Sequence, residues 1–433
     1  IMSATDSSQY DEILIESTTD KNRTVDLRTG VQSIDYYEDL FSPTITAKIL
    51  VTTTGSVIDN TGVYLGLPLR GGERLSMKIR GNVGSNPGLD FSSDNSLFVS
   101  SINNVIRDSK QETFVLNLCS REAITNETSR VPIRFPTSSP ISVSAEEIIK
   151  KYLVTGKELF IDKTSNKYGF IGNMKKPFTL LTWLASKGVP ESGGDGTAGY
   201  FFYETQDGYC FKSVDSLIAQ DVSEVYTATE ISDPNNKQDY QILNHVTTRN
   251  NNLLEKLRLG QFSTQRSYFN PLTFDYTRPE KGLFKLENYA GKSKNLGKSF
   301  EMPPIKEGSN TTLGDIPSRL VTGIVDIGTL EDGVSYEENA DPFRYQSQAI
   351  MRYNIMFTQT MTITVPSNTN LKAGNLIQCL FPSTTVSENS KFDGEISGLY
   401  MIKELCHHFD AQGSYTSLKL IRDTFGQYGK NNK

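Results

Sequence analysis

The sequence has few of the residues from which metal and catalytic sites are commonly built. Its 433 residues include only three histidines, one tryptophan and four cysteines. The cysteines lie far apart and have no paired spacing, at Cys119, Cys210, Cys379 and Cys406. They therefore suggest neither a zinc motif nor a disulfide framework. This cysteine usage fits folding in a reducing compartment.

Long apolar runs and a positive net charge are missing as well. No apolar run approaches the roughly 20 residues of a membrane-spanning helix, and the polar start IMSATDSSQYDE does not resemble a secretory signal. We therefore expect a soluble protein that does not insert into a membrane. The net charge of −6 disfavours tight binding of nucleic acid, which rests on Lys and Arg side chains that neutralise phosphates.

Catalytic signatures are also missing from the chain. It has no nucleophile elbow, no His-Glu-x-x-His motif and no P-loop. Residues Gly194 to Gly199 match G-x-G-x-x-G, but a predicted helix precedes them and the aromatic strand 200–205 follows. A dinucleotide site needs the reverse order, so we predict a glycine-rich loop and no cofactor.

A cysteine, two histidines and an aspartate are packed into residues 406–410, which raises the question of a metal site. From 399 to 409 the apolar residues alternate, as in a β-strand, and residues 415–421 read as a second strand after a turn. Neighbouring strand residues point to opposite faces, so His407 and His408 are not expected to share an ion. We predict a hairpin, and no catalytic, cofactor-binding or metal residues.

Three sections follow one another along the chain. The first, to about residue 130, contains alternating strands at 45–54, 73–81, 97–106 and 112–120. Two helices are then predicted. One begins at a capping box formed by Ser144 and Glu147, and the other begins near Pro177 and carries the single tryptophan, Trp183, as a packing residue. Strands return at 239–284, where His245 is taken as structural, and at 350–365 and beyond.

Residues 290–345 read as a long connection with separated charges. Lysines come first, at 292, 294 and 298, and acidic residues accumulate later, at Asp326, Glu331, Asp332, Glu337, Glu338 and Asp341. Such a segment is either a solvated loop or a clamp that lies across a neighbouring subunit. The sequence leaves both interpretations open.

Two stretches resemble a known protein family. The stronger is MTITVPSNTNLKAGNLIQCLFP with SGLYMIKELCHHFDAQGSYTSLKLIRDTFG, and the weaker is SREAITNETSRV. Their matching features are the strand, polar turn and glycine of Asn370 to Ile377, then Gly398, Tyr400, His407 or His408, and the pair Arg422 and Asp423. This pattern resembles the baseplate tail hub proteins of contractile-tailed bacteriophages, and the hub part of type VI secretion spike proteins.

The resemblance implies a mainly β fold with a small α/β insert and two tail-tube-like β-barrel domains of the same topology. The implied domains are a first barrel at 1–130, an α/β insert at 131–235, a second barrel at 236–290 with 345–428, and an extended connection at 291–344, which is the possible intersubunit clamp.

The resemblance also implies a structural virion protein and not an enzyme. It implies a homotrimeric hub in the tail baseplate, assembled in the host cytoplasm, that adapts a sixfold tail tube to a threefold spike. Its expected partners are the hexameric tube protein, the trimeric spike protein and other baseplate proteins. DNA would pass through its channel without specific binding, which suits an acidic protein. Two alternatives stay open: a cell-wall or carbohydrate hydrolase, and a receptor- or carbohydrate-binding tail protein.

Overall fold

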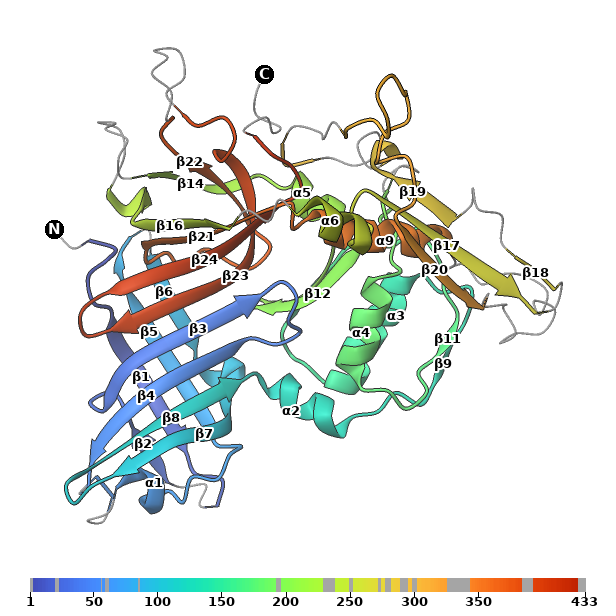
Figure 1. Ribbon diagram of the computed structural model, residues 1–433. Helices are drawn as coiled ribbons and strands as arrows, with labels where there is room; N and C mark the ends of the chain where they lie inside the picture. Colours follow the sequence, from blue (N-terminus) through green and yellow to red (C-terminus); the bar gives the residue numbers. More distant parts are fainter. Residues whose placement is uncertain are drawn as a thin grey trace.

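The computed structural model describes most of the chain, and strands dominate it (Figure 1). The described residues are 3–19, 23–55, 57–58, 62–84, 86–191, 196–228, 238–248, 252–271, 274–276, 282–288, 295–297, 302–324, 343–383 and 392–426. Among them, no helix is long and apolar enough to cross a membrane.

The N-terminal section consists almost entirely of strands of one 15-stranded sheet. They are β1 (Gln9–Glu16), β2 (Thr24–Asp26), β3 (Val31–Asp39), β4 (Thr46–Thr54), β5 (Arg74–Val83), β6 (Asn86–Phe91), β7 (Leu97–Arg107) and β8 (Gln111–Cys119). A short helix α1 (Val63–Gly66) and a 3-10 turn, Ser93–Asn95, interrupt them. Buried and exposed residues alternate along β3, β4 and β8, because one face of each strand packs into the core.

The C-terminal section contributes the other strands of the same sheet. They are β14 (Val222–Ala228), β15 (Gln241–Ile242), β16 (Asn244–Thr248), β21 (Gln359–Pro366), β22 (Leu376–Leu380), β23 (Gly398–Asp410) and β24 (Ser414–Arg422). A 3-10 turn, Gln238–Tyr240, lies before β15. The two sections share one core cluster, and its side chains include Tyr36, Phe114, Tyr400 and Phe409.

The order of five strands is the same in both sections. In the first set the neighbours run β3, β4, β8, β7, β5, and in the second they run β16, β21, β24, β23, β22. Every one of these pairings is antiparallel, and the strands occur in the same sequence along the chain. The fold is therefore mainly β and contains a repeated five-strand unit. The closure of each set into a barrel and the domain boundaries given above remain predictions.

A small α/β unit lies between the two sets, as the sequence predicted. It contains α2 (Arg121–Thr128), β9 (Arg134–Phe135), α3 (Ile141–Ile148), a π-helical turn (Ile149–Leu153), β10 (Glu158–Ile161), β11 (Phe170–Ile171), α4 (Pro177–Ala185), β12 (Tyr200–Thr205), β13 (Gly208–Ser213) and α5 (Val214–Ala219). Strands β10, β13 and β12 form its sheet, and an aromatic cluster fills its own core. Trp183 packs against that cluster, 5.5 Å from Phe170 between ring centres.

Both predicted helices are present, but the first residue of one of them was predicted wrongly. Helix α4 begins with Pro177 in its first turn, as expected. Helix α3 begins after Pro140, so Ser144 lies inside the helix and does not cap it. The carbonyl of Pro140 accepts bonds from the N–H groups of Val143 and Ser144, at 3.1 and 3.2 Å. Pro140 therefore occupies the N-cap position, four residues before the one that the capping box indicated, and no side chain caps this helix.

A third group of elements projects beside the insert (Figure 1). Strands β17 (Ser263–Asn270), β18 (Asp275–Tyr276), β19 (Leu283–Lys285) and β20 (Arg319–Ile324) form a separate 4-stranded sheet, next to α6 (Leu253–Leu259) and α9 (Phe343–Ile355). The prediction of a strand from residue 350 is wrong up to Ile355, because these residues belong to helix α9. Met351 and Ile355 are buried on one face of that helix.

The long connection is described only in part. Residues 302–324 are described, and β20 within them pairs in parallel with β17. Lys292, Lys294 and Lys298 and the acidic residues from Asp326 to Asp341 lie outside the described residues. The clamp therefore remains a prediction.

Candidate functional site

The feature that unites the molecule is the junction at which the two strand sets pair. The first strand of the first set, β3, pairs antiparallel with the C-terminal half of β23 in the second set, from Glu404 opposite Asp39 to Asp410 opposite Ser33. The N-terminal half of β23 pairs with β22. One long strand thus has two different neighbours along the same edge, and the sheet continues from one set into the other.

His407 lies on the inner face of this junction. It is fully buried, its Nδ1 lies 2.9 Å from Thr416 Oγ1, and its ring stacks on Tyr36 with 6.0 Å between centres. Burial disfavours the charged imidazolium and lowers the pKa of His407 to about 4. The ring is therefore neutral at physiological pH and acts as a packing residue.

His408 lies on the opposite, outer face. Its Nδ1 is 2.6 Å from Asp35 Oδ1 across the strands, and its Nε2 is 3.1 Å from Asp410 Oδ2. The hydrogen bond with Asp35 raises the pKa of His408 to about 9, so this ring is charged at neutral pH. The predicted alternation of His407 and His408 is confirmed.

Metal ligation is a separate question from this alternation. Within the described ranges, no group of three or more His, Cys, Asp or Glu side chains is placed to hold a metal ion. Cys406, on the outer face, has a thiol whose pKa burial raises to about 12, which opposes formation of the thiolate that metals bind. That the hairpin binds no metal remains a prediction.

Glu38 connects three parts of the chain at the same junction. It is 1% exposed and accepts hydrogen bonds from Tyr36 Oη at 2.8 Å, from Gln206 N in the insert at 2.7 Å, and from Ala373 N before β22 at 2.9 Å. Burial raises the pKa of Glu38 to about 7, although these hydrogen bonds oppose the shift. One carboxyl group therefore fixes the first set, the insert and the second set relative to one another.

A second buried carboxylate anchors the insert to the first set. Glu204 on β12 accepts from Ile45 N, before β4, at 3.0 Å, and its other oxygen lies 2.5 Å from Lys157 Nζ. Lys157 also bonds Glu122 of α2, at 2.9 Å. Burial works against the charge of Lys157, but attraction to the two glutamates prevails and raises its pKa. The lysine is thus held charged between two carboxylates.

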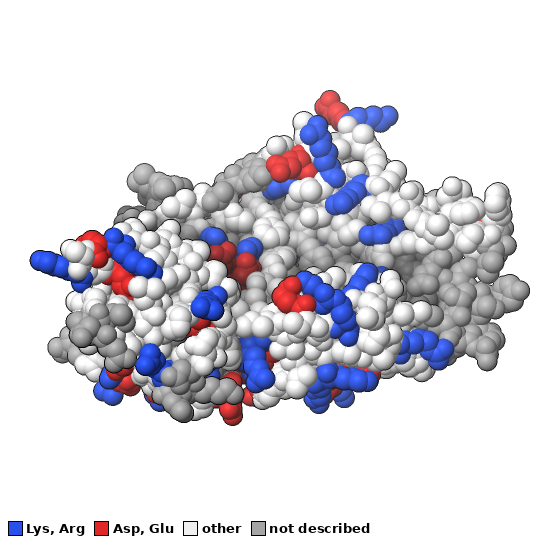
Figure 2. All heavy atoms as spheres, turned by 90° about the horizontal axis from the view of Figure 1, so that it is seen from below, with Lys and Arg blue, Asp and Glu red and all other residues white. Residues whose placement is uncertain are grey.

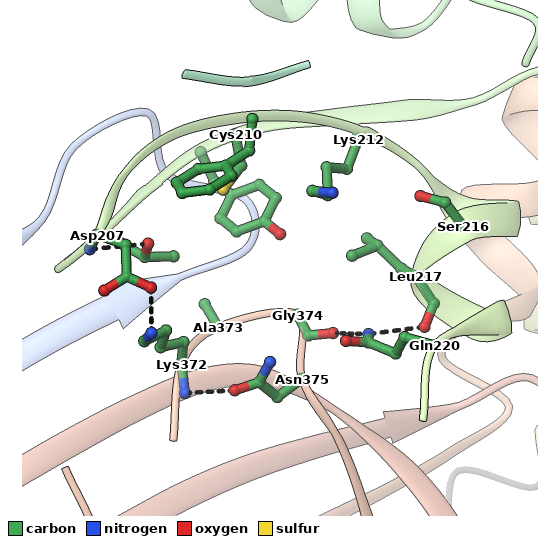
Figure 3. Close-up of a pocket in the computed structure, with 13 residues that line it drawn as sticks. Asp207, Cys210, Lys212, Ser216, Leu217, Gln220, Lys372, Ala373, Gly374 and Asn375 are labelled. Atoms are coloured by element: carbon green, nitrogen blue, oxygen red, sulfur yellow. Dashed lines mark hydrogen bonds and ion pairs between the residues drawn. The ribbon is translucent and has the colours of Figure 1, made fainter. Parts of the chain in front are cut away.

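A pocket of about 250 Å³ lies between β13, α5 and the turn before β22 (Figure 3). Its polar groups bond mainly to one another. Lys372 pairs with Asp207, and Gln220 Nε2 donates to the carbonyls of Gly374 at 2.6 Å and Leu217 at 2.7 Å. These contacts connect the second set to the insert, so the pocket lies within the junction of the two.

Comparison with solved structures gives the fold a context. The chain is similar to a tail protein from Neisseria meningitidis MC58, with a TM-score of 0.55 and 10% identity over 95% of this chain and 96% of that one. It is also similar to the 43 kDa tail protein of prophage MuSo2 from Shewanella oneidensis, with a TM-score of 0.52 and 10% identity over 95% and 98%. The chain has the fold of phage tail proteins.

A further comparison gives a lower structural similarity. A component of the type VI secretion system from E. coli aligns over 93% of this chain and 76% of that one, with 8% identity and a TM-score of 0.44, which is too low to carry an argument. No protein-family model matches the sequence, and no curated protein matches it.

The surface seen from below the view of Figure 1 carries charges of both signs (Figure 2). Basic and acidic side chains are interspersed over it. Several exposed pairs are in direct contact, among them Lys78 with Asp90 at 2.9 Å and Arg80 with Asp11 at 2.9 Å. That the protein does not bind nucleic acid tightly remains a prediction from its net charge.

Sequence reasoning missed the two buried carboxylates, Glu38 and Glu204. The signal for Glu38 is present in the alternation, since Ile34, Tyr36, Glu38 and Leu40 share one face and are all buried. An acid among apolar residues on an inward face indicates a buried acceptor. The signal for Glu204 is weaker, because the surrounding segment Tyr200–Thr205 is buried on both faces. The other histidine considered, His245, packs its ring 4.8 Å from Phe381, in agreement with a structural role.

Proposed function

We propose that this chain is a structural hub protein of a phage tail. The observation that carries the proposal is the repeated five-strand unit, two copies of which lie in one chain and pair edge to edge. Three such chains present six similar units. A threefold ring of this kind can meet a sixfold tube on one side and a threefold spike on the other, which no ring of single-unit subunits does so simply.

The partners follow from this role. They are the hexameric tube protein, the trimeric spike protein and other baseplate proteins, and the hub resides in the tail baseplate after assembly in the host cytoplasm. DNA passes through its channel during ejection without specific binding. The acidic net charge supports this part of the proposal, because negative potential repels the phosphate backbone.

The hub is proposed to be non-enzymatic. Three ionisable side chains described above, Glu38, Glu204 and His407, are buried and bonded within the protein. Such groups stabilise the arrangement of the three parts and are not accessible to a substrate. No observation in the described residues favours the hydrolase or the receptor-binding alternative over the hub.

Molecular mass in solution tests the proposal. Light scattering of the purified protein is expected to give three times the 48.3 kDa of one chain. Mixing with a purified hexameric tube protein should then yield a complex of one trimer with one hexamer. A chain that stays monomeric at tens of micromolar, or that hydrolyses cell-wall material, would contradict the hub.

A further inference from the structure

The two strand sets match residue by residue at one bend. In the first set, Gly72 N donates to Val99 O at 2.7 Å, and Val99 N donates to Glu73 O at 2.9 Å. Immediately afterwards the register of β7 against β8 shifts between Val99 and Ser101. The pairing of β7 with β5 therefore stops at Val99, and β7 continues beyond it.

The second set repeats this bend. Gly374 N donates to Ile402 O at 2.8 Å, and Ile402 N donates to Asn375 O at 2.9 Å. The register of β23 against β24 shifts between Ile402 and Glu404. Gly72 and Gly374 both have a positive φ, at 86° and 85°. Val99 and Ile402 thus occupy the same position in the two sets.

With these two residues matched, each strand of the first set corresponds to one strand of the second. Residues that face one another across four strands form a row, and two such rows correspond: Ser101, Asn117, Lys48 and Asp35 in the first set, and Glu404, Lys419, Thr362 and Val246 in the second. Four residues earlier in β8 and β24, the row of Ile106 and Thr113 corresponds to the row of His408 and Tyr415. Val246 is therefore the equivalent of Asp35, and Ile106 that of His408.

At the internal junction these two positions face each other. β3 pairs with the half of β23 that β22 leaves open, and Asp35 lies opposite His408. The first strand of one set thus covers the open half-strand of the other set.

The equivalent edges are open in the described part of this chain. Among the described strands, β7 beyond the bend at Val99 pairs with β8 alone, and β16 pairs with β21 alone. Both edges expose β-branched apolar side chains, since Ile106 is 67% exposed, Val105 38% and Val246 58%. Open strand edges with exposed apolar residues attract further strands unless something covers them.

We infer that β16 of one copy of this chain pairs antiparallel with the outer half of β7 of a second copy. Val246 then lies opposite Ile106, as Asp35 lies opposite His408 within the chain. Two facing β-branched residues stabilise such a pair. The two edges lie at separate places on one molecule (Figure 1), so one copy cannot satisfy both.

One local difference defines the match more closely. Between the two corresponding rows, β7 has one residue more than β23, and its register shifts again between Asn103 and Ile106, where Asn104 has a φ of 52°. Asparagine tolerates this left-handed conformation better than most residues. The inferred contact is therefore centred on the Ile106 end of β7.

The pairing is heterologous, because different strands of each copy meet. Such a contact closes into a ring or grows into a filament, depending on the rotation between copies. That the ring contains three copies rests on the proposed function, whereas the pairing itself rests on the repeated strand order. The two can therefore be tested apart.

Charge substitution across the inferred pair provides the test. Ile106→Lys and Val246→Asp are made singly and together, and mass is measured by light scattering at one protein concentration. Each single variant is expected to dissociate into single chains, because a lone charge is left in the contact. The double variant should regain the wild-type mass, because Lys and Asp then pair as His408 and Asp35 do. Ile171→Lys, at another exposed strand residue, is the matched control and should keep the wild-type mass.

The outcomes separate the pairing from the hub. If the wild-type protein is a trimer and both single variants are trimers too, the inferred pairing is refuted and the proposed hub function is not. A double variant that stays dissociated, or a control that dissociates too, also overturns the pairing. An assembly of another size that responds to the substitutions as expected supports the pairing and refutes the trimer. A monomeric wild-type protein refutes both.

Discussion

Replacing Glu38 by glutamine should change how stability depends on pH. The carboxyl accepts three hydrogen bonds, and two of its donors are backbone N–H groups of Gln206 and Ala373. Glutamine keeps the size of the side chain and one acceptor oxygen, but turns an amide group towards one of those donors. Leaving a buried donor unpaired costs about 1–3 kcal/mol. The variant is therefore expected to fold with reduced stability.

The sign of the pH effect follows from the raised pKa. The pKa of Glu38 rises from 4.5 to about 7 on folding, so the folded protein binds this proton more tightly than the unfolded chain does. Its contribution to stability therefore falls as the pH rises from about 4.5 to about 7, and is constant above that. Between about pH 5 and about pH 8 the loss amounts to about 2 kcal/mol. Glutamine does not titrate and lacks this loss.

Urea denaturation of both proteins at the two pH values measures the difference. The free energy of unfolding should be higher for the wild-type protein than for Glu38→Gln at the lower pH. At the higher pH this difference in free energy should be smaller by about 2 kcal/mol. Glu307→Gln, at an exposed turn residue, serves as the control: its difference from the wild-type protein in unfolding free energy should be the same at both pH values. Parallel pH profiles for wild type and Glu38→Gln would show that the carboxyl titrates normally and that the reasoning is wrong.

Three further substitutions test the other ionisable groups described above. Lys157→Met leaves Glu122 and Glu204 without their cation and should cost about 3–5 kcal/mol in urea denaturation, and adding Glu204→Gln should recover part of that loss. No recovery would show that the charges are not coupled. The contribution of His407 to stability should fall as the pH drops from about 6.5 to about 4, opposite in sign to that of Glu38, because its lowered pKa means that the unfolded chain binds that proton more tightly. His407→Gln removes this component, so a variant with unchanged acid sensitivity would refute the assignment.

Local pattern was enough to predict the elements but not their neighbours. The hairpin of β23 and β24 follows from alternation and a polar turn, and α4 follows from proline and a helical apolar face. Helix α9 was missed because its sequence carries β-branched and aromatic residues. Its helical state depends on Met351 and Ile355 packing against Phe262 and Phe284, which lie far away in the sequence.

The junction could not be predicted from periodicity at all. Alternation shows that Leu405, His407 and Phe409 face inward, but a strand edge carries no side-chain signal for its partner. The partner, β3, lies more than three hundred residues earlier, and the two are matched only by backbone hydrogen bonds and by contacts such as that of Asp35 with His408. A resemblance to tail hubs supplied the expectation of two similar units, and the strand order supplies their connection.

The repeat is invisible in the sequence for a physical reason. In the corresponding outer rows, Ser101, Asn117, Lys48 and Asp35 stand where Glu404, Lys419, Thr362 and Val246 stand, and no residue is shared. The two sets instead share three features: the residues in these rows are not buried, most residues in the neighbouring row are buried, and the bulge lies at the same position. A sheet requires only that side chains alternate and that the backbone bends at the right place. The amino-acid identities can therefore diverge between the two sets. A one-residue shift in strand register is not tolerated, because it would turn the apolar residues of the strand towards solvent.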